Sequence, residues 1–229
     1  MARRNDHSKD ELRQLTLKAV RDFLAIYPPQ DMSLRKIARL IGYSPATIIN
    51  NFGSYGDLLL AVNAETLDEL HALSATAIRD ESQALDKSQA LSQNQAQLAL
   101  RKLARVYLAY ARKYPYRWHL AFEHRIAGQT TLPAWQKNRI DRLFALFTEQ
   151  LSRTGARKSL QELHIASRVV WAGVHGICLL AAGGGVVQEN NATGEQMLDM
   201  FLTGFLQTYT QTTQTAQSTM APVRTTIQL

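Results

Sequence analysis

The chain has 229 residues, 45% of them hydrophobic, and a formal net charge of +7. This length suits one helical domain of good size or two small ones, and a basic balance has the right sign for nucleic acid. The single cysteine, Cys178, excludes an internal disulfide and a multi-cysteine metal site. The first residues lack the apolar run of a secretory signal, so we expect a cytoplasmic protein.

The first predicted helix runs from Asp10 to Tyr27, where apolar residues recur at helical spacing. Pro28 and Pro29 end it, because proline removes a backbone donor and clashes with the preceding turn. We expect this helix to brace the two shorter helices that follow. The residues before it, 2–10, are interpreted as a flexible basic arm.

Two short amphipathic helices joined by a tight turn come next. Ser33 is a good N-cap for the first, and Gly42 supplies its C-cap because glycine adopts positive φ without steric cost. Ser44 caps the second helix, with Pro45 at its first position, where a missing N–H does no harm. Thr47 either packs this helix down or faces outward. The pattern predicts a helix-turn-helix whose second helix suits the major groove of DNA.

Charge supports this interpretation. Residues 1–53 hold nine Lys and Arg against five Asp and Glu, which is +4 of the total charge. The alternative is a basic surface that is merely solvated. We expect Thr47, Asn50 and Asn51 to contact base edges, because asparagine suits adenine. The other candidates on this surface are Ser33, Arg35, Lys36, Ser44, Pro45 and Tyr55, most of which would hold phosphates.

This segment resembles the DNA-binding domain of the TetR family of one-component bacterial transcription regulators. Ile49 and Tyr55 depart from the family pattern, where a phosphate-contacting tyrosine and a lysine are usual. The resemblance implies an all-α homodimer whose helical body binds a small effector and shifts the long helix after the DNA-binding head. The matching residues are Ser33, Ile37, Ala38, Gly42, Ser44, Ala46, Thr47, Ile48 and Phe52.

The rest of the chain predicts further helices and no strands, giving about nine helices in an all-α fold. Ser54 and Asp57 form a plausible capping box for a long helix to about Ala77. Residues 79–97 are interpreted as a polar connection, partly helical at most. We expect a DNA-binding domain at 1–53, an effector-binding and dimerisation domain at 54–210 and a disordered tail at 211–229. The later helices are predicted at 98–114, 116–127, 133–153, 160–182 and 194–209.

The second half resembles a C-terminal domain of one TetR branch, named for a Trp-His-Gly signature, through Trp171, His175 and Gly176. In that family the last two long helices form a four-helix interface with a partner copy. Small residues recur along one of these helices and favour close helix approach, although a tightly packed monomer core is the alternative. The predicted interface residues are Ala166, Val169, Gly173, Gly176, Ile177, Leu180, Met197, Phe201 and Phe205.

Aromatic residues of the body suggest an effector pocket. Trp118, Phe122, Trp135 and Trp171 either line an apolar cavity or are plain core. His175 is either a core histidine satisfied by a hydrogen bond or a pocket residue that orients the ligand. We expect a small apolar or amphipathic effector.

Catalytic, metal and membrane patterns are weak. We find no nucleophile elbow and no phosphate-binding glycine loop, so we expect no enzyme, no metal and no cofactor. His119 and Glu123 share a helical face, which leaves a metal sensor as a lesser alternative. Residues 169–187 are long enough to span a membrane but contain a histidine and several glycines.

Together, the helix-turn-helix and the two resemblances predict a ligand-responsive repressor that binds a palindromic operator as a homodimer. A DNA-binding protein whose body docks a protein partner is the alternative.

Overall fold

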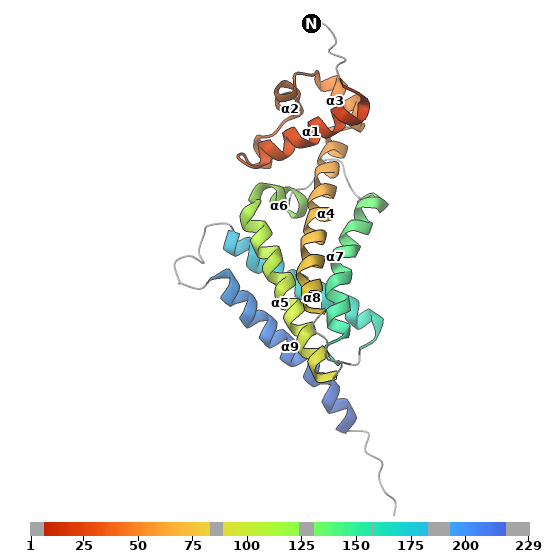
Figure 1. Cartoon of the computed structure of the whole chain (residues 1–229), viewed down its shortest axis with the longest axis vertical. Helices are drawn as coiled ribbons and strands as arrows, with labels where there is room; N and C mark the ends of the chain where they lie inside the picture. The colour runs from red at the N-terminus through yellow and green to blue at the C-terminus, as the bar shows by residue number, and fades with distance from the viewer. Residues whose placement is uncertain (1–6, 83–88, 124–130, 157, 183–192, 219–229) are drawn as a thin grey trace, which may run out of the picture. The chain divides into compact units, whose positions relative to one another are not determined.

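The computed structural model describes residues 7–82, 89–123, 131–156, 158–182 and 193–218. In this part of the chain the fold is all-helical, with nine α-helices and one short 3-10 turn (Figure 1), which confirms the predicted class. The helices are α1 (Lys9–Leu24), α2 (Leu34–Ile41), α3 (Pro45–Phe52), α4 (Tyr55–Ser82), α5 (Gln89–Lys113), α6 (Pro115–Phe122), α7 (Ala134–Ser152), α8 (Leu160–Ala182) and α9 (Gly194–Ser218), with the turn η1 (Pro29–Asp31) after α1.

Several helices differ in length from the prediction. α4 continues to Ser82, and α5 begins at Gln89, so much of the expected polar connection is helical. Alanine and glutamine are good helix formers, and Ala96 and Ala99 are buried against neighbouring helices. α9 continues to Ser218, so the start of the expected tail is helical too. The predicted continuation of α6 beyond Glu123 lies outside the described residues.

The contacts divide the chain into two compact units. The first unit comprises Met1–Leu73 and Leu108–Leu143, and the second comprises Ser74–Tyr107 and Phe144–Leu229. Helices α4, α5 and α7 each supply residues to both. The predicted domain boundary after Gly53 falls inside the first unit, and the division into domains stays a prediction.

The core of the first unit lies where α1, α2, α3 and the start of α4 meet. Val20, Ile37, Ile48 and Leu58 are each fully buried there. Leu120 of α6 joins the same cluster, and α6 also contacts η1 and α1. The helix-turn-helix therefore rests on a core that extends beyond the three N-terminal helices.

Acidic side chains of α4 bind arginines from three other helices of this unit. Glu65 pairs with Arg21 of α1, and Asp68 pairs with Arg139 and Arg142 of α7 at 2.9 and 2.5 Å. These pairs link α4 to α1 and to α7.

The pair between Glu69 of α4 and Arg117 of α6 is the most buried of these. Glu69 Oε2 accepts hydrogen bonds from Arg117 Nη2 at 2.7 Å and from the Tyr110 hydroxyl at 3.1 Å. The Arg117 side chain is only 9% exposed, and its Nε has no hydrogen-bond partner among the described residues. Burial raises the pKa of the Tyr110 hydroxyl, so this hydroxyl stays a donor at neutral pH.

In the second unit, α8 and α9 pack directly on each other. The Phe201 ring of α9 lies over Gly173 of α8, where an added Cβ would stand 2.2 Å from Phe201 Cζ. Arg101 and Arg105 of α5 both bind Asp199 of α9, at 3.4 and 2.8 Å. Packing within one chain therefore already explains one glycine of α8.

Apolar side chains remain exposed on α8 and α9. Ile165, Val169 and Leu180 of α8 are each about half exposed, and Met200 of α9 is 79% exposed. Among the described helices, one segment, Leu160–Ala181, is long and apolar enough to cross a membrane. Length and composition alone are weak evidence, because a helix that packs in a protein core passes the same test.

Candidate nucleic-acid interface

Capping residues set the turn between α2 and α3. Ser33 Oγ accepts a hydrogen bond from the Lys36 N–H at 3.3 Å, and Ser44 Oγ accepts one from the Thr47 N–H at 3.1 Å. Gly42 ends α2 with φ at 74°, in the left-handed region that favours glycine. These predicted caps are confirmed, and they fix how α2 leads into α3.

The two asparagines of α3 lie in different surroundings. Asn50 is exposed, whereas Asn51 is half-buried. Asn51 Nδ2 donates to the Lys9 carbonyl at 2.7 Å, and its Oδ1 is buried. The Asn51 amide thus joins α3 to the start of α1, which disfavours the base-contacting role predicted for it. Asn50 keeps its amide in solvent.

Thr47 and Tyr55 also make contacts inside the protein. The Thr47 hydroxyl lies 2.8 Å from Ser44 Oγ, and the residue is half-buried. The Tyr55 ring packs against the core of the first unit, and burial raises the pKa of its hydroxyl. A phosphate contact by Tyr55 stays a prediction.

The outer face of α2 is basic. Arg35, Lys36 and Arg39 are all exposed. Lys36 Nζ donates to the Asp31 carbonyl at 2.5 Å, while Arg35 and Arg39 make no ion pair or hydrogen bond within the described part of the chain. The predicted phosphate-contacting cations Arg35 and Lys36 are therefore on the surface.

Sequence reasoning missed the contacts that anchor the start of α1. Ser8 and Glu11 form a capping box, in which the Glu11 carboxylate accepts from the Ser8 N–H at 2.7 Å. This hydrogen bond lowers the pKa of Glu11. Arg13 of α1 lies 4.4 Å from the ring centre of Phe52 in α3. A serine followed three residues later by glutamate was the available signal, whereas Arg3 and Arg4 of the predicted arm lie outside the described residues.

The predicted effector residues fall into both units. In the first unit, Trp118 is buried with its ring 5.9 Å from that of Phe122, while Trp135 is 43% exposed. In the second unit, the Trp171 and His175 rings stack at 4.8 Å. His175 Nδ1 lies 2.7 Å from the Tyr107 hydroxyl, so the histidine has the hydrogen-bond partner that its partly apolar surroundings require.

The predicted interface residues also differ in exposure. Ala166 is buried inside the second unit, and Gly173 is covered by Phe201. Val169 and Leu180 are exposed, and a Cβ added at Gly176 would meet no atom within 4 Å. Ile177, Met197, Phe201 and Phe205 are half-buried.

Among the described residues, no group of three or more His, Cys, Asp and Glu side chains is placed to hold a metal ion. His119 and Glu123, the pair considered for a metal sensor, therefore have no third protein ligand of these types in the described part of the chain. The candidate site is the surface of α2 and α3, which carries the exposed amide of Asn50 and the cationic groups of Arg35, Lys36 and Arg39.

Comparisons with known proteins agree with this description. Residues 100–205 match the family model described as the tetracyclin repressor-like C-terminal domain. A search of curated proteins finds no match.

Solved structures of similar fold span nearly the whole chain. A protein of unknown function from Rhodococcus sp. RHA1 has a TM-score of 0.66 at 18% identity, covering 90% of this chain and 98% of that one. A TetR transcriptional regulator from the same organism has a TM-score of 0.55 at 13% identity, with coverage of 87% and 98%. The TetR family regulator PfmR from Thermus thermophilus has a TM-score of 0.54 at 16% identity, with coverage of 84% and 96%. At these identities the likeness is one of fold.

Proposed function

We propose that this chain is a TetR-family transcriptional regulator, which the match of its C-terminal part and its all-helical fold support. In this proposal it is a cytoplasmic repressor that binds a palindromic operator as a homodimer and leaves it when a small apolar or amphipathic effector binds. Regulators of this family act by binding and not by catalysis. The observation that carries the proposal is the capped α2–α3 pair, with exposed Asn50 on α3 and exposed Arg35 and Lys36 on α2.

In this proposal α3 enters the major groove of DNA. Asn50 reads a base edge, with adenine the preferred partner of an asparagine amide. Thr47 is a second candidate because it is only half-buried and its hydroxyl hydrogen-bonds to the neighbouring Ser44 of the same helix end. Ser33, Ser44 and the cations of α2 hold phosphates, which position the protein but carry little sequence information. Asn51 orients α3 through its hydrogen bond to the Lys9 carbonyl.

Exposed apolar faces of α8 and α9 support a homodimer. Val169, Leu180 and Met200 would be covered by a partner copy, and the open space at Gly176 and Gly204 admits a close helix approach. Two recognition helices in one dimer would enter successive major grooves about 34–36 Å apart. The two-fold symmetry of such a dimer calls for a palindromic operator.

The effector is proposed to act through linkage. A ligand that binds more tightly to a conformation whose recognition helices do not fit the operator lowers operator affinity, at most by the ratio of its affinities for the two conformations. A ligand that binds both conformations equally leaves operator affinity unchanged. The stacked Trp171 and His175 are the best candidates in the second unit, with Tyr107 orienting the imidazole. Membership of the Trp-His-Gly branch rests on Trp171, His175 and Gly176 and stays part of the proposal.

The proposal is tested by selecting duplexes from a random library with the purified full-length chain. We expect enriched sequences to contain two inverted half-sites about ten base pairs apart, centre to centre. Lys36→Ala should reduce the slope of log affinity against log salt by about one unit, because one phosphate contact is lost. Lys137→Ala, which removes an exposed cation of α7, is the matched control and should leave the slope unchanged. Absence of duplex binding, or enrichment of sites without symmetry, would contradict the proposal.

A further inference from the structure

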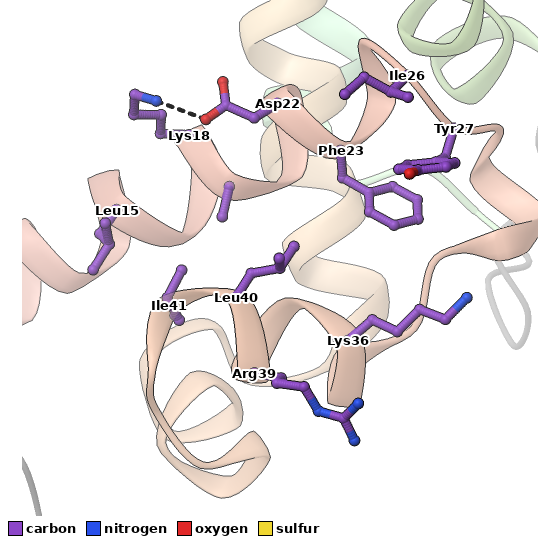
Figure 2. A pocket seen from close by; sticks show the side chains of 11 residues that line it. Leu15, Lys18, Asp22, Phe23, Ile26, Tyr27, Lys36, Arg39, Leu40 and Ile41 are labelled. Carbon is purple, nitrogen blue, oxygen red and sulfur yellow. Dashed lines mark hydrogen bonds and ion pairs between the residues drawn. The ribbon is translucent and has the colours of Figure 1, made fainter.

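A groove of about 620 Å³ runs between α1 and α2 within the first unit (Figure 2). Leu15 and Phe23 of α1 point toward Leu40 and Ile41 of α2 across it. Phe23 and Ile41 are half-buried and pack against the core from outside, so they form its floor. Leu40, in contrast, is 63% exposed at its edge.

Several apolar side chains that line the groove stay exposed and do not pack into the core of the first unit. Ile26 is 66% exposed and Tyr27 is 49% exposed, and both line the same groove as Leu40. Three large apolar side chains gathered on one surface differ from apolar residues scattered singly, and such patches mark binding sites. DNA phosphates and base edges would leave these side chains unused, so the groove calls for an occupant with an apolar face.

The shape of the groove favours a helix over a small molecule. Small ligands lose most of their surface in deep pockets, whereas Leu40 and Ile26 here keep more than half of their surface in solvent. Leu15 and Phe23 lie eight residues apart on α1, so the groove extends along that helix for about 12 Å at 1.5 Å per residue, and Ile26 lies just beyond the end of the helix. About two turns of an amphipathic helix fit that length, with anchors at three- and four-residue spacing.

The rim of the groove is cationic. Lys18, Lys36 and Arg39 line it together with one acid, Asp22, which already pairs with Lys18 at 2.6 Å. Arg39 makes no hydrogen bond or ion pair with any described residue, so its guanidinium is available to a carboxylate. In Figure 2 the Lys36 and Arg39 side chains extend outward from α2 beside the apolar lining. The charge that complements this rim is negative.

We propose that this groove docks an amphipathic helix of a protein partner, with an apolar face between flanks of Asp and Glu. Lys36 also belongs to the surface proposed to hold phosphates, so an acidic helix bound here competes with DNA for it. This second statement rests on the proposed function. The partner would then act as an antagonist of DNA binding that reads the head of the regulator rather than its effector site.

The docking is tested with a labelled helical peptide of about 15 residues, with leucines on one face and glutamates on the flanks. Its anisotropy is measured with the full-length chain, beside a second peptide in which lysines replace the glutamates. We expect the acidic peptide to bind at least about tenfold more tightly than the basic one. Leu40→Asp should weaken binding of the acidic peptide by about tenfold or more. Arg39→Glu should reduce the difference in affinity between the acidic and the basic peptide.

Leu132→Asp is the matched control, because Leu132 is 50% exposed in the same unit but lies outside the groove. It should bind the acidic peptide as the unaltered chain does. Absence of binding, equal binding of both peptides, or full binding by Leu40→Asp would overturn the proposal. If the peptide does not bind but decanoate does, and Leu40→Asp abolishes decanoate binding, the occupant of the groove is a small amphiphile. If the chain self-associates and Leu40→Asp abolishes this, the occupant is a second copy of the chain.

Competition is measured separately with a duplex of mixed sequence. The acidic peptide should displace the duplex from the unaltered chain and not from Leu40→Asp. If the chain binds no duplex, the proposed function fails while peptide binding still supports the docking groove. If the peptide binds but leaves the duplex in place, the competition is overturned and the docking stands.

Discussion

Removing the carboxylate of Glu69 tests the buried ion pair that joins α4 to α6. In Glu69→Leu the Arg117 guanidinium, 9% exposed and already without a partner at Nε, loses its 2.7 Å hydrogen bond to a carboxylate. Breaking a buried pair by deleting one partner costs about 3 kcal/mol, because the remaining charge stays in a poorly solvated site. Leucine is a good helix former, so the cost should not come from helix propensity.

Urea unfolding followed by far-UV circular dichroism measures this cost. With a slope of about 3 kcal/mol per molar for a chain of this size, the midpoint should fall by about 1 M. Asp22→Leu removes an acid from a pair whose side chains are 65% and 63% exposed, and should leave the midpoint nearly unchanged. The double variant Glu69→Leu, Arg117→Met should regain part of the loss, since no charge is left unpaired. Equal shifts for Glu69→Leu and Asp22→Leu, or no recovery in the double variant, would refute the reasoning.

Three further predictions follow from the site and its supports. Asn51→Ala should lower the free energy of unfolding by about 1 kcal/mol, because the hydrogen bond to the Lys9 carbonyl is lost. Asn50→Ala should leave the free energy of unfolding unchanged but weaken binding to a selected duplex more than binding to a random one. The opposite pattern would exchange the roles of the two residues. Gly176→Arg should convert the proposed dimer to a monomer in sedimentation equilibrium, and an unaltered mass would place the interface elsewhere. Burial raises the folded-state pKa of Tyr110, so its contribution to stability should be complete below the unfolded pKa of about 10 and be lost as pH rises through the raised value. The free energy of unfolding of Tyr110→Phe should therefore fall less steeply with rising pH than that of the unaltered chain, and equal losses in the two proteins would contradict this.

Local chemistry explains why the helix-turn-helix was predictable. A serine before an amphipathic run and a glycine after it act through bonds within a few residues, so Ser33, Gly42 and Ser44 could be placed from the sequence. The long helices followed from apolar periodicity in the same way. The start of α5 did not, because its early turns contain few large apolar residues and depend on alanine and glutamine propensity instead.

Features that depend on distant partners could not be predicted. Arg117 and Glu69 are 48 residues apart, and nothing near Arg117 indicates that its charge is buried. The glycines of α8 signal close packing but not the neighbour, and the structure assigns Gly173 to Phe201 of the same chain. Asn50 and Asn51 look alike in the sequence, yet the position of α1 decides that Asn51 turns inward.

Hydrogen exchange of the full-length chain, with and without a selected duplex, tests the central claim most directly. If α2 and α3 dock on DNA, amides of residues 33–52 should exchange more slowly in the complex, while those of α7 should be unaffected. Slower exchange confined to helices outside 33–52 would show that another surface binds the duplex and would contradict the account.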